Sequence, residues 1–137
     1  MNIVLAALNR NTIYTPLALL YCRACLRADP VAGPRVSIEL KEFELDDSLE
    51  YVLWEIVRSS PAIVAFSCYL WNIQAVLRLS AMIRQVLPSA RIVLGGPEVS
   101  SRARELLAGN PAVDLVVRGE GEFVFARVVR AYLRLEA

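Results

Sequence analysis

The sequence contains no histidine at any of its 137 positions. Histidine is the commonest protein ligand for metals, and it is the side chain whose unperturbed pKa lies nearest to neutral pH. Its absence therefore excludes every site that depends on a histidine ligand or on a histidine as general acid or base.

Cysteine and long apolar runs are also scarce. The three cysteines, Cys22, Cys25 and Cys68, cannot form an even set of disulfides, which favours a reducing compartment. Polar residues interrupt each apolar run well before the ~20 residues of a membrane span. The opening MNIVLAALNRN lacks the organisation of a signal peptide. We expect a cytoplasmic chain that does not enter the membrane.

An excess of charge of one sign is lacking too, because 15 basic residues stand against 14 acidic ones and the net charge is +1. This balance gives no electrostatic reason to expect nucleic acid or an anionic membrane as a partner. Apolar residues, in contrast, make up 56% of the chain. In a chain with the length of a single domain, this content suggests that a ligand or another domain covers part of the surface.

Hydrophobic patterns predict five strands that alternate with five helices. Strands are expected at residues 2–8, 35–45, 62–67, 91–96 and 113–117. The second alternates in part between apolar and polar residues, as an edge strand does, whereas the others are continuously apolar and predict burial on both faces. The first helix has an apolar spacing that predicts a core-facing side made of Leu17, Leu20, Tyr21, Ala24, Cys25 and Ala28.

This order of elements predicts an α/β fold, a flavodoxin-like (Rossmann-like), doubly wound, five-stranded parallel sheet with strand order 2-1-3-4-5. Residues 1–137 are expected to form one domain. Right-handed crossovers, with the switch between strands one and three, place a ligand at the carboxyl ends of the strands. Four loops should meet there as one crevice, with the sequences NRNTIYT, SCYLWN, GGPEVS and RGEGE.

Several known sites on this topology do not match these loops. A receiver domain needs aspartates after the first and third strands and a lysine after the fifth, where this chain has Asn9, Ser67 and Arg118. A flavin mononucleotide site needs a phosphate-binding loop after the first strand, and this loop contains no glycine. The only G-x-G motif is flanked by Glu120 and Glu122, whose carboxylates would repel a pyrophosphate and instead suit the start of the last helix.

Three segments in this order, FSCYLWN, VLGGPEVS and VVRGEGE, resemble the N-terminal cobalamin-binding domain of cobalamin-dependent radical S-adenosylmethionine proteins. That family has a serine after the third strand and a glycine pair after the fourth. Here Ser67 and Gly95 are 28 positions apart (95 minus 67), which is similar to the family spacing. The resemblance covers nearly the whole chain.

The resemblance implies that cobalamin binds in the crevice and that its nucleotide tail passes between the sheet and the helices. The implied contact residues are Asn9, Thr12, Tyr14, Thr15, Ser67, Tyr69, Leu70, Trp71, Asn72, Gly95, Gly96, Pro97, Glu98, Gly119, Glu120 and Gly121. A Cβ atom on Gly95 or Gly96 would then occupy the channel of the dimethylbenzimidazole end. The alternative is that the glycines only allow a tight turn and that Ser67 only precedes a helix.

The chain also departs from the family. NRNTIYT replaces the loop that carries a cobalt-ligating histidine, so cobalamin would bind without a protein histidine ligand. The C-x-x-x-C-x-x-C motif for an iron–sulfur cluster is absent, so S-adenosylmethionine and a 4Fe-4S cluster would belong to a C-terminal radical domain outside this chain. The C-x-x-C pair of Cys22 and Cys25 has no second pair to complete a zinc site, and we interpret it as structural.

The expected function is that of a cobalamin-binding module without catalytic residues of its own. Tyr69, Leu70 and Trp71 in one crevice loop suggest that a catalytic domain covers this face, and that the isolated domain forms weak homodimers through it. The alternative function is a flavodoxin-like interaction or scaffold domain without a cofactor.

Overall fold

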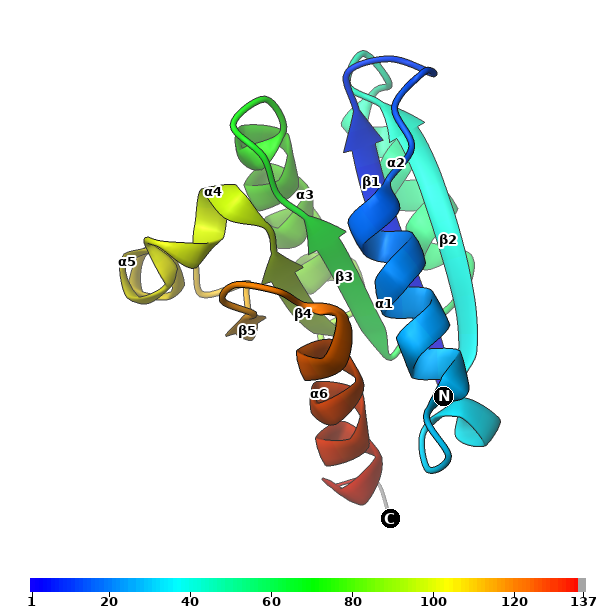
Figure 1. The fold of residues 1–137 in the computed structure, drawn as a ribbon. Helices are drawn as coiled ribbons and strands as arrows, with labels where there is room; N and C mark the ends of the chain where they lie inside the picture. Colours follow the sequence, from blue (N-terminus) through cyan, green and yellow to red (C-terminus); the bar gives the residue numbers. More distant parts are fainter. Residues whose placement is uncertain (136–137) are drawn as a thin grey trace.

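The computed structural model describes residues 1–135, and it contains one parallel five-stranded sheet (Figure 1). The strands are β1 (Asn2–Asn9), β2 (Ser37–Glu44), β3 (Ile63–Ser67), β4 (Arg91–Gly95) and β5 (Leu115–Val116). Their order is β2-β1-β3-β4-β5, with β2 at one edge. The predicted fold class, strand order and edge strand are confirmed.

The helices form a layer on each face of the sheet. The helical elements are α1 (Leu17–Ala28), η1 (Gly33–Arg35), α2 (Leu49–Val57), α3 (Ile73–Val86), α4 (Pro97–Ser100), α5 (Ala103–Gly109) and α6 (Glu122–Leu135). Helices α1 and α6 lie side by side in front of the sheet in Figure 1, and α2 and α3 lie behind it. No helix within residues 1–135 combines the length and the apolar character that crossing a membrane requires.

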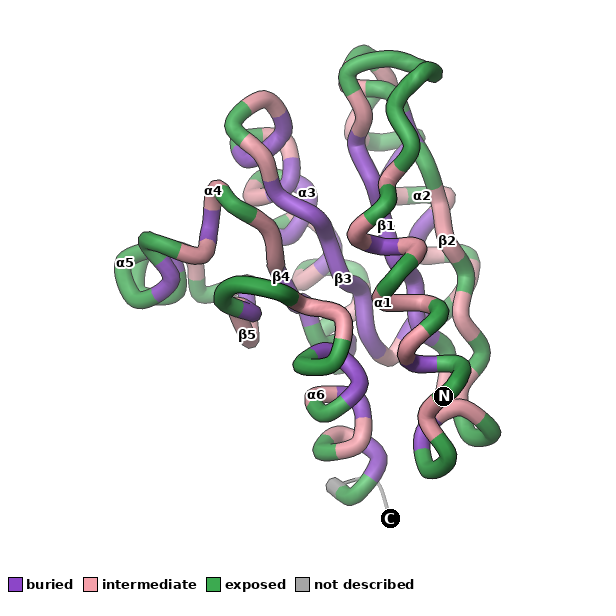
Figure 2. Tube along the Cα trace, in the orientation of Figure 1, coloured by how far each residue is buried: buried purple, intermediate pink, exposed green. Residues whose placement is uncertain are grey.

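The alternation of side chains along each strand divides the core into two clusters. Along β1, Ile3 and Leu5 face the layer of α1 and α6, whereas Val4 and Leu8 face that of α2 and α3. Figure 2 shows the buried strands running through the middle of the molecule. Burial on both faces explains why the inner strands read as continuous apolar runs.

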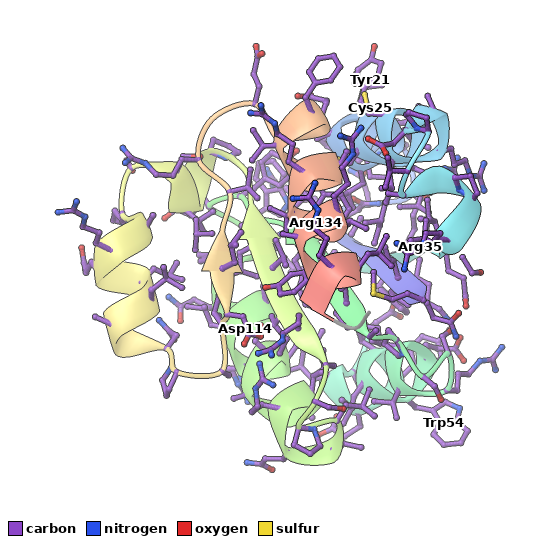
Figure 3. The ribbon with its side chains drawn as sticks, turned by 90° about the horizontal axis from the view of Figure 1, so that it is seen from below. Tyr21, Cys25, Arg35, Trp54, Asp114 and Arg134 are labelled. Carbon is purple, nitrogen blue, oxygen red and sulfur yellow. The ribbon has the colours of Figure 1, made fainter. Side chains whose placement is uncertain are left out.

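The predicted core-facing side of α1 is wrong. Leu19 and Leu26 are buried, whereas Leu17 and Tyr21 are 55% and 53% exposed. In Figure 3 Tyr21 points away from the sheet. The segment LALLYC is apolar on more than one side, so spacing alone could not select the side that α6 and the sheet cover. An unused apolar stripe therefore remains on the outer surface of α1.

An ion pair between Asp29 and Arg130 joins α1 to α6. Asp29, which follows α1, accepts two hydrogen bonds from Nε of Arg130, at 2.9 and 2.8 Å. The Arg130 hydrogen bond holds the pKa of the Asp29 carboxyl at about 2. The tie fixes the two helices against each other on the face of the sheet that holds the candidate site.

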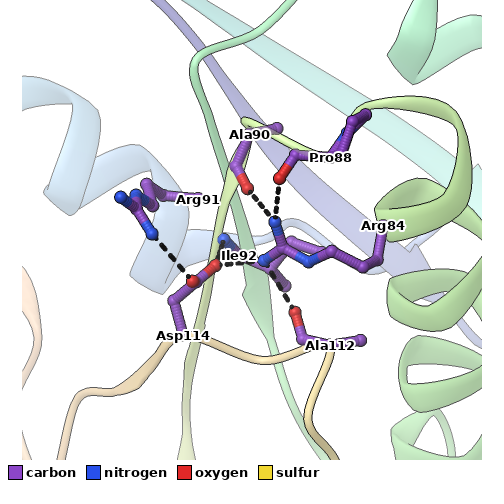
Figure 4. A network of polar contacts seen from close by, with 7 residues as sticks. All are labelled: Arg84, Pro88, Ala90, Arg91, Ile92, Ala112 and Asp114. Carbon is purple, nitrogen blue, oxygen red and sulfur yellow. Dashed lines mark hydrogen bonds and ion pairs between the residues drawn. The ribbon is translucent and has the colours of Figure 1, made fainter.

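An arginine fastens the opposite end of the molecule. The Arg84 guanidinium donates to the carbonyl oxygens of Pro88 (2.7 Å), Ala90 (2.8 Å) and Ala112 (3.0 Å), and it pairs with the carboxylate of Asp114 (Figure 4). The same carboxylate accepts a hydrogen bond of 2.7 Å from the Ile92 amide. These contacts tie the end of α3 to the amino-terminal ends of β4 and β5.

Candidate ligand-binding site at the carboxyl ends of the strands

A cavity of about 480 Å³ lies between the sheet and the helices α1 and α6. Its walls are mostly apolar and come from Leu5, Ala65 and Val93 of the sheet, Leu19 of α1 and Phe125 of α6. It reaches the ends of β3 and β4, where the loops of the predicted crevice begin. An aromatic group of moderate size fits a space of this kind.

Ser67 supplies a free polar group in this cavity. The residue is 7% exposed, and its Oγ atom is buried with no hydrogen-bond partner among residues 1–135. A buried hydroxyl without a partner is costly, and such groups are rare in folded proteins. The Ser67 hydroxyl therefore has an unused hydrogen-bonding capacity beside the cavity.

Gly95 lies directly opposite Ser67 in the register of β3 and β4, and it also lines the cavity. A Cβ atom added to Gly95 would have the Cβ of Val117 as its nearest neighbour, at 3.9 Å. The space beside Gly95 is thus open, in agreement with a glycine kept for a close-lying ligand.

Gly96 has a different reason to be glycine, and the expectation that its Cβ would fill a ligand channel is wrong. Its φ is +108°, and a Cβ atom there would lie 2.5 Å from the carbonyl oxygen of Cys68 and 2.9 Å from its nitrogen. The Cys68 amide donates to the Gly95 carbonyl at 2.7 Å, which draws the two loops together. Gly96 is required by the approach of a neighbouring backbone.

The loop into α6 forms the remaining wall. Gly119, with a φ of +70°, and Glu120, Gly121 and Glu122 all line the cavity. The lining that the structure describes includes these two carboxylates and no lysine or arginine. This wall does not favour an anionic group at its surface, as the sequence indicated.

Cys22 is a lining residue that sequence reasoning missed, because the predicted face of α1 contained Cys25 instead. Its Sγ lies 3.8 Å from the place of a Cβ added to Gly121. Burial, and then the charge of Glu122, raise the pKa of the Cys22 thiol to about 11. At neutral pH Cys22 is therefore a protonated, weakly polar part of the wall.

A smaller space of about 160 Å³ adjoins the first, and Ser67 and Tyr69 line both. It brings together residues that the sequence placed in two separate loops. Those residues are Asn9, Tyr14, Thr15, Tyr69, Trp71 and Asn72. The Tyr69 and Trp71 rings stack with centroids 4.5 Å apart, and the Tyr14 ring lies 5.9 Å from that of Trp71. The crevice thus has an aromatic wall.

Asn72 holds this loop in place. It is 1% exposed, and its Oδ1 accepts a hydrogen bond of 2.8 Å from the Tyr69 amide. Its Nδ2 donates to the carbonyl oxygens of Ser67 at 3.0 Å and Leu8 at 3.3 Å. Because these contacts use both ends of the amide, Asn72 positions the neighbouring loop residues.

The structure brings most of the predicted residues to one or the other space, with three exceptions. Thr12, Leu70 and Glu98 line neither space. Leu70 is 79% exposed, and Glu98 pairs with Arg102 at 2.8 Å. Pro97 lines the larger cavity together with Ser100, which the sequence did not single out.

Within residues 1–135, no group of three or more histidine, cysteine, aspartate or glutamate side chains is placed to hold a metal ion. The larger cavity is a mostly apolar slot whose lining includes the hydroxyl-bearing residues Ser67, Tyr69 and Ser100. Such a slot suits a flat, neutral part of a ligand.

Comparison with known proteins gives this geometry a context. Residues 3–129 match the family model described as the B12 binding domain. A methyltransferase of Streptantibioticus cattleyicolor, named for 2-(S-pantetheinyl)-carbapenam-3-carboxylate, is 34% identical over 71 residues, which cover 52% of this chain and 10% of that protein. The cobalamin-dependent radical SAM methyltransferase TokK of Streptomyces tokunonensis is 32% identical over 73 residues, or 53% of this chain and 11% of that protein.

The chain therefore spans about a tenth of the length of these curated relatives. A crystal structure of a cobalamin-binding protein from Desulfitobacterium hafniense superposes with a TM-score of 0.64. That alignment covers 97% of this chain and 57% of the other, at 15% identity. At this identity the likeness shows a shared fold.

Proposed function

Because this chain belongs to the B12-binding domain family, we propose that it holds cobalamin, with the nucleotide tail in the 480 Å³ cavity. The observation that carries the proposal is the buried, unpartnered hydroxyl of Ser67, a residue that lines the apolar cavity and lies opposite Gly95. The hydroxyl can bond a ring nitrogen of the base, and the missing side chain leaves room for the ring. The volume of about 480 Å³ and the mostly apolar lining support a place for the dimethylbenzimidazole end.

The corrin would then lie over the carboxyl ends of β1 and β3. The aromatic wall of Tyr14, Tyr69 and Trp71 gives that end of the sheet an apolar surface. Asn9 and Thr15 flank it, and Asn72 fixes the loop that carries two of the rings. When bound, the corrinoid would supply a cobalt centre, whose lower ligand cannot be a histidine of this chain.

We further propose that this chain serves a radical S-adenosylmethionine domain of the same polypeptide, which would hold the 4Fe-4S cluster and S-adenosylmethionine. The support is that the relative TokK is a cobalamin-dependent radical SAM methyltransferase, and that this chain matches only 11% of it. Ile13 and Leu70, which are 87% and 79% exposed, leave apolar surface on two crevice loops for such a domain to cover. In its absence the same surface would drive weak homodimers.

An interaction domain without a cofactor is the competing function. It is favoured by Gly96, which the chain's own backbone explains, and by the lack of a histidine. It leaves the Ser67 hydroxyl and the open cavity beside Gly95 without a purpose.

A binding experiment separates these functions. The purified domain is mixed with hydroxocobalamin, desalted and examined by visible absorption, in parallel with cobinamide, a corrinoid that lacks the nucleotide tail. We expect retained corrin bands with cobalamin and weak or no retention of cobinamide. A colourless protein after desalting would contradict cobalamin binding. Equal retention of both corrinoids would contradict the role of the cavity.

A further inference from the structure

The cavity has two levels along the strands. Ser67 and Gly95 form the upper level, beside each other in register near the crevice. Two residues earlier on each strand, Ala65 and Val93 also lie side by side, and Leu5 of β1 pairs with Ala65. These three residues form the lower level, which is the deep end of the cavity.

The two levels differ sharply in polarity. Leu5, Ala65 and Val93 are at most 6% exposed, and Leu19 and Phe125 close the space from the helices at 5% and 3%. None of these five side chains has a nitrogen or oxygen atom. The backbone groups of the three strands are engaged in the parallel ladder. A ligand edge that reaches the lower level meets only hydrocarbon.

The polar groups near the upper level are mostly engaged or distant. The Ser100 hydroxyl donates to the Gly96 carbonyl at 2.8 Å and accepts from the Gly119 amide at 3.2 Å. Glu120 is exposed on the loop beyond β5, at the mouth of the cavity. Tyr69 and the Cys22 thiol also line the cavity, and the unpartnered hydroxyl of Ser67 lies two residues above the apolar deep end on β3.

We propose that this cavity selects the lower base of the corrinoid by its far edge, and that it takes a benzimidazole-type base in preference to a purine. The inference rests on the proposed function. With the imidazole side of the base at Ser67, the dimethylated ring of a benzimidazole reaches Leu5, Ala65 and Val93 and buries only carbon. A purine in the same place points its ring nitrogens and amino group at these side chains.

An unpaired polar group buried in this way costs about tenfold in affinity or more. The methyl groups of the benzimidazole gain from the same burial. Both effects favour the benzimidazole, so the cavity can discriminate against a purine without a side chain that repels it.

The test compares three probes on the purified domain by equilibrium titration: cobalamin, the corrinoid with adenine in place of dimethylbenzimidazole, and tail-less cobinamide. We expect cobalamin to bind at least about tenfold more tightly than the adenine form. Equal affinity for cobalamin and the adenine form, with cobinamide weaker, would overturn the selection and leave cobalamin binding intact. Absence of binding by all three would overturn both proposals.

Two variants locate the selecting surface. Val93→Thr and Ala65→Ser each add a hydroxyl to the lower level with little change in volume, and circular dichroism checks that each variant is folded. In at least one of these variants, we expect the ratio of the affinity for cobalamin to the affinity for the adenine form to fall severalfold. Ser101→Ala, on the exposed surface, is the control and should leave the ratio unchanged. An unchanged ratio in both folded variants would overturn the assignment of the deep end.

Discussion

Ser67 and Gly95 face each other across β3 and β4, one with a hydroxyl that no neighbour uses and the other with a side that no neighbour fills. Both open into the same cavity. In the protein alone, the unpartnered hydroxyl of Ser67 is unfavourable and the space beside Gly95 has no explanation. A ligand that accepts a hydrogen bond from Ser67 and fills the space beside Gly95 would account for both.

Replacing Ser67 separates stability from binding. In Ser67→Ala, a buried hydroxyl without a partner is lost, so the free domain should be as stable as the wild type or slightly more stable. Cobalamin should bind about tenfold more weakly because its hydrogen bond is lost. Thermal unfolding without ligand and titration with cobalamin measure the two effects. A variant that is markedly less stable would show that the hydroxyl has a structural role.

Filling the gap beside Gly95 should block the cavity. Gly95→Val places three carbon atoms in the open space, and cobalamin affinity should fall by at least about tenfold. Gly109→Val is the matched control, because a Cβ there meets nothing within 4 Å and the residue lies outside the cavity. Normal cobalamin binding by a folded Gly95→Val would remove the tail from this position.

At Gly96 we expect a substitution to lower the stability of the domain, whereas at Gly95 we expect it to lower cobalamin affinity. Gly96→Ala forces a Cβ against the Cys68 carbonyl at a positive φ, which should destabilise the domain by about 1–3 kcal/mol. Gly95→Ala, one residue earlier, should have a much smaller effect on stability. Urea unfolding of the pair gives the comparison. Equal midpoints for both variants would contradict the structural explanation of Gly96.

The contacts of Arg84 at the amino-terminal ends of β4 and β5 should contribute to stability and not to cobalamin binding. Arg84→Met leaves the Asp114 carboxylate and three carbonyl groups without this partner, and we expect a loss of about 2 kcal/mol in unfolding free energy. Arg78→Met, an exposed position on α3, is the control. Cobalamin affinity of the folded Arg84→Met protein should match that of the wild type, since neither Arg84 nor its contact residues line the cavity.

The raised pKa of Cys22 gives a measurable signature of the cavity wall. Alkylation requires the thiolate, and a pKa of about 11 makes that form scarce at neutral pH. Between about pH 8 and pH 10 the alkylation rate of Cys22 should rise roughly tenfold per pH unit. Mass spectrometry of peptides from the Cys25→Ser variant measures the rate at Cys22 apart from that at the buried Cys68. Bound cobalamin should slow the reaction, and cobinamide should not; equal rates with both would place the tail elsewhere.

The sheet could be predicted because its signals are local. Each signal can be recognised from a few neighbouring residues. These signals are the continuous apolar runs of the inner strands, the half-polar run of β2, and the prolines and glycines between elements. The order of strands then follows from general rules of connection. The candidate residues in the four loops were found for the same reason, since their position at strand ends follows from the topology.

The parts that sequence reasoning missed depend on contacts across space. Gly96 is set by the backbone of Cys68, which belongs to a different loop. Cys22 lines the cavity because α1 turns that side toward α6, a choice that its several apolar faces left open. Apolar spacing alone selected Cys25, and only the packing of the helices shows that Cys22 lines the cavity.

The charges around the cavity have a kinetic consequence. Its described lining carries two glutamates and no lysine or arginine, so nothing there attracts a ligand that bears a phosphodiester. The lining itself therefore gives no electrostatic steering, and we expect the association rate of cobalamin to stay at the ordinary level for docking. A tight complex would then owe its affinity to slow dissociation of the ligand. The proposed burial of the aromatic end in the apolar slot would provide that slow dissociation.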